Sequence, residues 1–176
     1  MTPVRLAIVA MVLSALVAGV ALYYLQVYAY YEEVDAEAAG GVQLTDAETD
    51  APEPIAFDNF RAIDANSSPI RFRACFDTPL SQDELREAYV IAAAPEPLTG
   101  PGWFDCYDAQ EIGAALERGD AIALMGVENI DYGIDRLVAV LPDGRGVAWH
   151  QINRCGAVVF DGEPVPDDCP EPPETD

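Results

Sequence analysis

The sequence contains no lysine and a single histidine, His150, and its 31 acidic residues face nine basic residues, all of them arginine. The formal net charge of −22 disfavours nucleic acid as a partner, because an acidic surface repels the phosphate backbone. The sequence also has no G-x-S-x-G nucleophile motif, phosphate-binding glycine loop or EF-hand calcium loop. We therefore nominate no catalytic residue, no metal ligand and no cofactor.

Charge is also absent from residues 6–25, which read LAIVAMVLSALVAGVALYYL. A helix of that length spans about 30 Å, the thickness of a bilayer's hydrocarbon core. Five tyrosines at and after its end resemble an aromatic belt at a membrane interface. We expect an uncleaved transmembrane anchor with its aromatic belt over residues 1–31. The alternative is a secretory signal peptide, whose apolar core is shorter and whose only late cleavage candidate here is Gly19-Val20-Ala21.

The distribution of basic residues predicts the orientation of this anchor. Arg5 precedes the apolar run, and the next basic residue is Arg61. Positive charge flanking a span favours the cytoplasmic side. We therefore expect the N-terminus in the cytoplasm and residues 32–176 on the other side of the membrane.

One face of the predicted membrane helix consists of small residues. Its members are Ala10, Ser14, Ala18 and Ala21. Small residues let a second helix approach closely, and a serine can hydrogen-bond across the contact. The face is a candidate contact with an envelope protein. The alternative is that such residues are simply frequent in membrane helices.

Beyond the anchor, about 140 residues are enough for one modest hydrophobic core. Residues 32–56 hold many acids, no base and few apolar residues, and we interpret them as an acidic linker with a possible short strand at 42–45. The folded domain is expected over residues 57–163. Residues 164–176 form an acidic, proline-rich tail. Acidic flanks could bind Ca²⁺ or a basic partner, but solvation alone explains them.

Hydrophobic periodicity predicts an α+β fold: an N-terminal transmembrane helix, then one small domain with a mostly antiparallel sheet and two short helices. Ser81-Gln82-Asp83-Glu84 and Asp108-Ala109-Gln110-Glu111 are capping boxes that begin the two helices. The expected helices span 81–89 and 108–118, and the expected strands span 70–76, 120–127, 134–141, 146–152 and 157–160.

Four cysteines occur in this domain: Cys75, Cys106, Cys155 and Cys169. None forms a C-x-x-C pair, which argues against a thioredoxin-like site and a structural zinc site. An even number on the oxidising side of a membrane favours two disulfides, and we expect Cys75 with Cys106 and Cys155 with Cys169. Reduced buried thiols are the alternative. The similar tripeptides Cys75-Phe76-Asp77 and Cys106-Tyr107-Asp108 also suggest a faint internal repeat. Chance similarity is the alternative.

Three residues are candidates for a ligand site: Arg71, Arg73 and His150. The alternation of the predicted strand places Arg71 and Arg73 on one face, where two guanidinium groups could clamp an acidic ligand. Pairing with the protein's own carboxylates is the simpler interpretation. His150 has no nucleophile or triad partner in the sequence, so we expect a structural histidine.

The segments IRFRACFDTPLS, GWFDCYDAQEIGAALE and ENIDYGIDRLVAVLPDGRGVAWHQINRCG, with the anchor ALYYLQVYAYYEEV, resemble a family of small alphaproteobacterial single-pass membrane proteins of unknown function. The resemblance covers Leu22 to Cys169. It implies a bacterial inner-membrane protein with a periplasmic domain. Members are sometimes labelled histidine kinases, but this sequence has no ATP-binding glycine boxes, and its one histidine lies late in a predicted strand. We reject kinase activity.

The sequence thus favours a non-enzymatic, membrane-anchored periplasmic protein that interacts with another envelope protein or complex. The alternative is a small-ligand binder or enzyme with a site around Arg71, Arg73 and His150. Convergence of those three side chains in one pocket would favour the alternative. Thiol exchange is a third hypothesis, and it requires an exposed or unpaired cysteine beside another.

Overall fold

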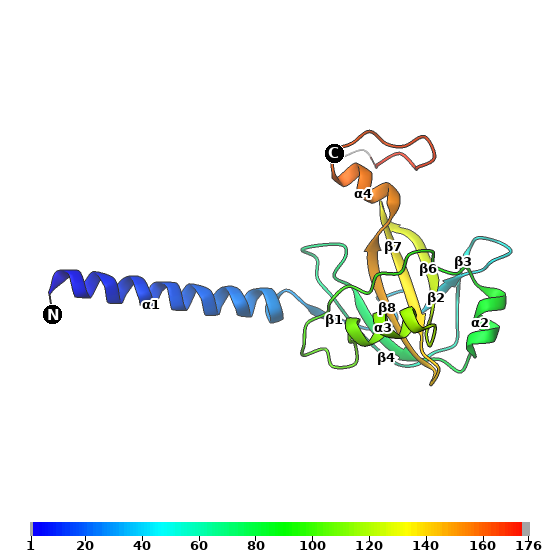
Figure 1. The fold of residues 1–176 in the computed structure, drawn as a ribbon, viewed down its shortest axis with the longest axis horizontal. Helices are drawn as coiled ribbons and strands as arrows, with labels where there is room; N and C mark the ends of the chain where they lie inside the picture. Colours follow the sequence, from blue (N-terminus) through cyan, green and yellow to red (C-terminus); the bar gives the residue numbers. More distant parts are fainter. Residues whose placement is uncertain (1, 174–176) are drawn as a thin grey trace. The chain divides into compact units, whose positions relative to one another are not determined.

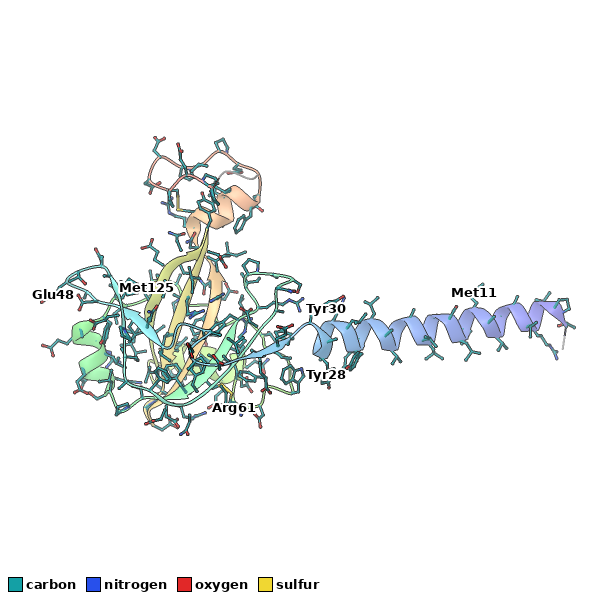
Figure 2. All side chains as sticks on the ribbon, turned by 180° about the vertical axis from the view of Figure 1, so that it is seen from behind. Met11, Tyr28, Tyr30, Glu48, Arg61 and Met125 are labelled. Atoms are coloured by element: carbon teal, nitrogen blue, oxygen red, sulfur yellow. A yellow bond between two sulfur atoms is a disulfide. The ribbon has the colours of Figure 1, made fainter. Side chains whose placement is uncertain are left out.

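The computed structural model describes residues 2–173 and divides into two compact units, Met1–Glu32 and Glu33–Asp176 (Figure 1). The first unit is the helix α1 (Pro3–Tyr24), which continues as the π-helical turn η1 (Leu25–Ala29). Apolar side chains project from every side of α1 and none is buried, as Figure 2 shows around Met11. Among the described residues this is the one helix long and apolar enough to cross a membrane.

The second unit is built on a six-stranded sheet with the strand order β1-β4-β5-β8-β7-β6 (Figure 1). Pairing is antiparallel from β4 through β5, β8 and β7 to β6. A separate antiparallel pair consists of β2 and β3. This architecture confirms the α+β prediction. The strands are β1 (Glu32–Val34), β2 (Gln43–Thr45), β3 (Pro52–Pro54), β4 (Asp58–Asp64), β5 (Arg73–Asp77), β6 (Ile122–Asp131), β7 (Ile134–Val140) and β8 (Arg145–Ile152).

The main hydrophobic core lies between one face of the large sheet and the segments that cover it. The cover consists of β2, the residues after β3, and α2 (Gln82–Ala88), whose Leu85 is completely buried. Ser81 and Glu84 form the predicted reciprocal capping box at the start of α2. The core residues are Val42, Leu44, Ile55, Ala62, Phe72, Ala74, Phe76, Leu85, Ile122, Leu124, Val138, Val140 and Ala148.

The opposite face of the sheet is covered by α3 (Ala109–Arg118), which packs through Ala115 against Leu141. Asp108 accepts hydrogen bonds from the backbone N–H groups of the first helical turn, as an N-cap residue should. The second half of the predicted capping box is wrong, because the Glu111 carboxylate instead accepts from Arg145 at 2.9 Å. Segments of the described chain therefore pack on both faces of the sheet.

The prediction of a linker over residues 32–56 is wrong. Val42, Leu44 and Ile55 are buried in the main core, and the Thr45 hydroxyl donates to the carbonyl of Gly126 at 3.1 Å. The compact unit thus begins at Glu33, not at residue 57. Burial of three apolar residues is enough to anchor an otherwise acidic segment. The possible short strand at 42–45 is present as β2, but so short an element did not distinguish a core segment from a linker in the sequence.

Residues 157–160 were predicted as a strand but belong to the helix α4 (Arg154–Phe160). The Asn153 side chain caps this helix by accepting from the N–H of Gly156 at 2.9 Å. The α4 backbone lies directly against the turn between β6 and β7, because a Cβ atom on Gly156 would overlap the backbone of Gly133. A good N-cap and a glycine–glycine contact override the strand preference of the Val-Val-Phe run.

Candidate functional site

His150 is the residue around which the candidate site is built. It lies on β8, is only 5% exposed, and stacks on the Phe72 ring with centroids 4.7 Å apart. Its Nδ1 atom lies 2.7 Å from the carbonyl oxygen of Pro69, and its Nε2 atom lies 3.0 Å from Nε of Arg136. The guanidinium N–H can only donate, so Nε2 accepts and Nδ1 carries the proton that is donated to Pro69. Both ring nitrogens are therefore committed to partners within the protein.

Arg136 is the buried cation of this cluster. It faces His150 directly across the β7–β8 pair and is 7% exposed. Its guanidinium lies 4.1 Å from the centroid of the Phe72 ring and donates to the Ala39 carbonyl at 2.7 Å. Burial lowers its pKa to about 10, and the carboxylates of Asp64 and Asp131 oppose that shift. The guanidinium stays charged at neutral pH, held by a ring face, a carbonyl and an imidazole.

This arrangement fixes the imidazole in its neutral form. Burial, followed by the charge of Arg136, lowers the pKa of His150 to about 4, although the hydrogen bond to Pro69 partly opposes the shift. A proton on Nε2 would both lose the hydrogen bond from Arg136 and place two positive charges side by side. His150 therefore has no free lone pair for a substrate and no proton to give at neutral pH. The geometry agrees with a structural histidine.

His150 forms part of the wall of a cavity of about 490 Å³ between residues 64–69, the β6–β7 turn and α4. Asp64 and Asp131 contribute carboxylates, and Tyr132 and Phe160 contribute rings. Burial raises the pKa of Asp64, against the opposing hydrogen bond from the N–H of Ala65. Groups with perturbed pKa values gather here, a pattern shared by binding sites and by buried ion networks. The charges of Asp64 and Asp131 also act on Arg136. Their presence is therefore explained if they serve as counter-ions to this buried arginine.

Arg73 lies on the other face of the sheet. It pairs directly with Trp149, the neighbour of His150 in β8, so strand alternation directs Arg73 and His150 to opposite faces. Its guanidinium donates to four backbone carbonyls, of Ile70, Phe72, Leu98 and Thr99, at 2.6–3.1 Å. It also lies over the Tyr107 ring at 5.5 Å. Arg73 therefore fixes the 98–107 segment to the sheet and does not present its charge to a ligand.

The three predicted ligand-site residues consequently do not form one pocket. Arg71 is partly buried and precedes β5, Arg73 is buried on one face, and His150 is buried on the other. The sequence analysis missed Arg136, which holds His150. The period-two pattern contained the signal, because Arg136 shares its sheet face with the core residues Val138 and Val140. A charged residue in an apolar row of a strand indicates a buried partner.

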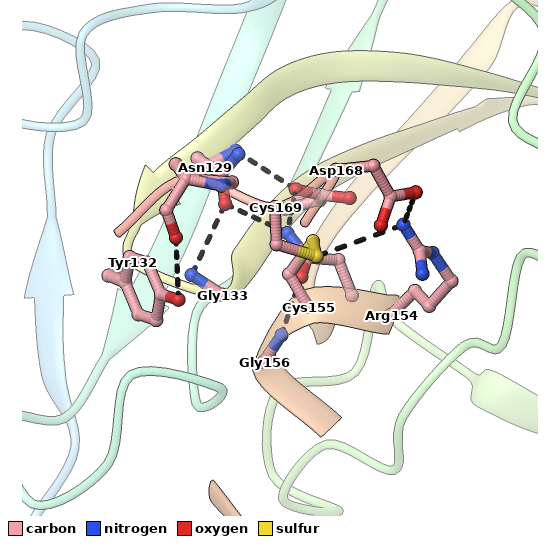
Figure 3. Close-up of a disulfide and its surroundings, with 11 residues drawn as sticks. Asn129, Tyr132, Gly133, Arg154, Cys155, Gly156, Asp168 and Cys169 are labelled. Carbon is pink, nitrogen blue, oxygen red and sulfur yellow. Dashed lines mark hydrogen bonds and ion pairs between the residues drawn. A yellow bond between two sulfur atoms is a disulfide. The ribbon is translucent and has the colours of Figure 1, made fainter. Parts of the chain in front are cut away.

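Two disulfides join Cys75 to Cys106 and Cys155 to Cys169, the pairs expected from the sequence. The first connects β5 to a loop, so Cys75 and Cys106 do not occupy equivalent positions, and the suggested internal repeat is not a structural one. Figure 3 shows the second, which ties the C-terminal segment to α4. Arg154 forms an ion pair with Asp168 and lies 3.7 Å from the Cys169 sulfur, and the Tyr132 hydroxyl donates to the Pro170 carbonyl at 2.9 Å.

The described residues contain no group of three or more histidine, cysteine, aspartate or glutamate side chains arranged to hold a metal ion. The chain matches the model of the Family of unknown function (DUF6446) over residues 42–170. No curated protein and no solved structure matches the chain. The matched range begins at the first buried residue of the main core, Val42, and reaches past the second disulfide.

Proposed function

Because the chain belongs to the Family of unknown function (DUF6446), we propose a role from its own residues: a non-enzymatic, single-pass membrane protein whose domain contacts another envelope protein. The observation that carries this proposal is the combination of one membrane-length apolar helix with two disulfides in the folded unit. Disulfides persist in oxidising compartments. An inner-membrane protein with a periplasmic domain satisfies both features.

The orientation in this proposal rests on Arg5, the one basic residue before α1, and on the absence of another before Arg61. The non-enzymatic character rests on the candidate site. Both ring nitrogens of His150 form hydrogen bonds within the protein, and the Arg73 guanidinium donates its hydrogen bonds to backbone carbonyls. These groups hold the fold together and leave no acid–base pair aimed at solvent.

We expect a reporter enzyme that is active only in the periplasm to be active when fused after Asp176. The disulfide-bearing domain would then be exported, and the uncleaved helix would keep it attached. Alkaline carbonate washing should leave the full chain in the membrane pellet. A reporter active only in the cytoplasm would contradict the orientation, and a soluble product beginning near Leu22 would identify α1 as a cleaved signal peptide.

The partner in this proposal contacts either the membrane helix or the domain. The small face of α1, formed by Ala10, Ser14, Ala18 and Ala21, is a proposed helix contact and is exposed along its length. Affinity purification of the tagged full chain from detergent-solubilised membranes separates the two routes. Replacing Ala10 and Ala18 with leucine fills this face, and leucine at Val12 and Val20, which have the same spacing on the other side of the helix, is the control. Loss of the co-purified protein in the first variant alone would assign the contact to the helix.

A further inference from the structure

The two edges of the six-stranded sheet differ. At β6 the edge is occupied, since the N–H of Met125 donates to Val90 at 2.8 Å and the N–H of Ala92 donates to Ala123 at 3.0 Å. At the other end the sheet stops at β1, and no further strand of the described chain pairs with it. An uncovered edge exposes backbone N–H and C=O groups that can pair with another strand. β1 is therefore the edge available to a partner.

A groove of about 560 Å³ lies beside this edge. Its apolar walls come from Phe60 on β4 and from Trp103 and Phe104 in the loop before α3. Glu33 and Asp35 supply carboxylates from β1 and the residue after it. An aromatic-lined groove along an open sheet edge is the geometry by which domains bind extended peptides: the edge pairs with the backbone, and the groove accepts alternate side chains.

The negative charge of the groove indicates which kind of ligand it can bind. Arg61 also lines it, but its guanidinium pairs with Asp105 at 3.0 Å and lies 5.4 Å from the Phe104 ring centroid. The carboxylates of Glu33 and Asp35 have no cationic partner among the described residues, and they belong to a chain with a net charge of −22. A second copy of this chain would bring the same carboxylates to the same edge, and like charges across paired strands are destabilising. The complementary ligand is a basic segment of a different protein.

We propose that β1 and the groove formed by Glu33, Asp35, Phe60, Trp103 and Phe104 bind an extended segment of a partner protein in which basic and apolar residues alternate. This inference rests on the proposed function and specifies the surface that the envelope partner uses. Backbone pairing with β1 holds the segment. Lysine or arginine side chains reach Glu33 and Asp35, and the apolar side chains that alternate with them lie beside Val34, which also lines the groove.

The test uses the full chain in non-ionic detergent and a defined probe: an eight-residue peptide, capped at both ends, that alternates lysine with valine and carries one central phenylalanine. Trp103 reports binding by fluorescence, because Trp149, the other tryptophan, is fully buried in the sheet. We expect saturable binding that weakens as salt is added. A peptide with glutamate in place of lysine should not bind. Equal binding of both peptides, or of neither, would overturn the proposal.

Two further comparisons locate the contact. E33Q/D35N should weaken binding about tenfold, since each partly exposed ion pair contributes a few-fold, whereas E117Q/E163Q changes the net charge equally and should bind as the native chain does. A lysine probe N-methylated at alternate residues cannot pair along one edge and should lose binding, with no change in the protein that could disturb its fold. Binding that survives N-methylation, or that falls equally in both variants, would refute binding at this edge.

This result is independent of the topology experiment. If the reporter fusion is periplasmic and the probe does not bind, the groove inference fails while the envelope role stands. If the probe binds and the reporter is active in the cytoplasm, the proposed binding surface is supported, and the proposed periplasmic location of the partner is wrong.

Discussion

Lowering the pH from 7 to 5 should reduce the domain's free energy of unfolding by about 2 kcal/mol through His150 alone, and a further fall to pH 4 should bring the loss to about 3 kcal/mol. The pKa of His150 is about 4 in the folded protein, against 6.5 for an ordinary histidine. Between these values the unfolded chain binds a proton that the folded protein does not, so stability falls as the pH falls. The cause is the burial of the ring beside the Arg136 guanidinium.

The carboxyl groups with shifted pKa values contribute differently. The pKa of Asp64 is raised, so its protonation stabilises the fold as the pH falls and partly offsets the effect of His150. The pKa of Asp46 is lowered by hydrogen bonds from Thr49, and that of Asp143 is lowered by Arg145. The stabilisation that these two carboxylates contribute is lost only as the pH falls to the ordinary carboxyl pKa and below it. The slope of the free energy of unfolding against pH between 6.5 and 5 therefore reports mainly the titration of His150.

The measurement is urea unfolding of the full chain in detergent, followed by fluorescence of the buried Trp149, at several pH values. The control is His150→Gln, whose amide can accept from Arg136 and donate to Pro69. We expect this variant to be less stable by about 1–2 kcal/mol at pH 7 and nearly flat from pH 6.5 to 5. The two curves should approach each other on acidification. Equal slopes in the two proteins would show that His150 does not titrate across this range.

The same residue shows how far sequence reasoning reached. The lack of a triad partner favoured a structural His150, which stays a prediction, and alternation placed Arg73 on the face opposite the core residues Phe72 and Ala74, as the structure shows. The sequence could not show that Arg136, fourteen positions earlier, would meet the imidazole. That contact depends on the register of the β7–β8 pair, which the turn at residues 142–144 sets only once the hairpin has formed.

The acidic segment before β4 was misread because composition averages over a window. Val42 and Leu44 alternate with polar residues and indicated a possible short strand at 42–45, but so short a pattern in acidic surroundings does not mark a core element, and Ile55 has no such pattern around it. Their burial is decided by a long-range contact: β2 lies beside β6, more than seventy residues later in the chain. Local alternation predicted β5 although its partner β8 lies far along the chain. It did not predict that the short elements within residues 32–56 would be buried, because that depends on contacts with distant strands.

The two disulfides are expected to differ in what they stabilise. The Cys75–Cys106 bond closes a separation of 31 residues and joins β5 to the loop that covers Arg73. In the chain-entropy description such a crosslink stabilises the fold by roughly 4 kcal/mol, because the unfolded chain loses conformational freedom. The crosslink contributes this full amount only if both of its cysteines lie in parts of the chain that must be in place for the domain to stay folded. Cys75 lies in β5, the third strand from the β1 edge, and Arg73 is buried beneath the loop, so the requirement is met.

The Cys155–Cys169 bond, with a separation of 14 residues, fixes a C-terminal segment that contacts the rest mainly through the Arg154–Asp168 pair and the Tyr132–Pro170 hydrogen bond. Without it the segment can detach while the sheet stays folded. We expect C75A/C106A to lower the free energy of unfolding by about 4 kcal/mol and C155A/C169A by under about 1 kcal/mol, measured by urea unfolding. Limited proteolysis should instead release residues after Phe160 only in the second variant. Equal losses of stability would mean that the C-terminal segment is as integral to the fold as the loop over Arg73.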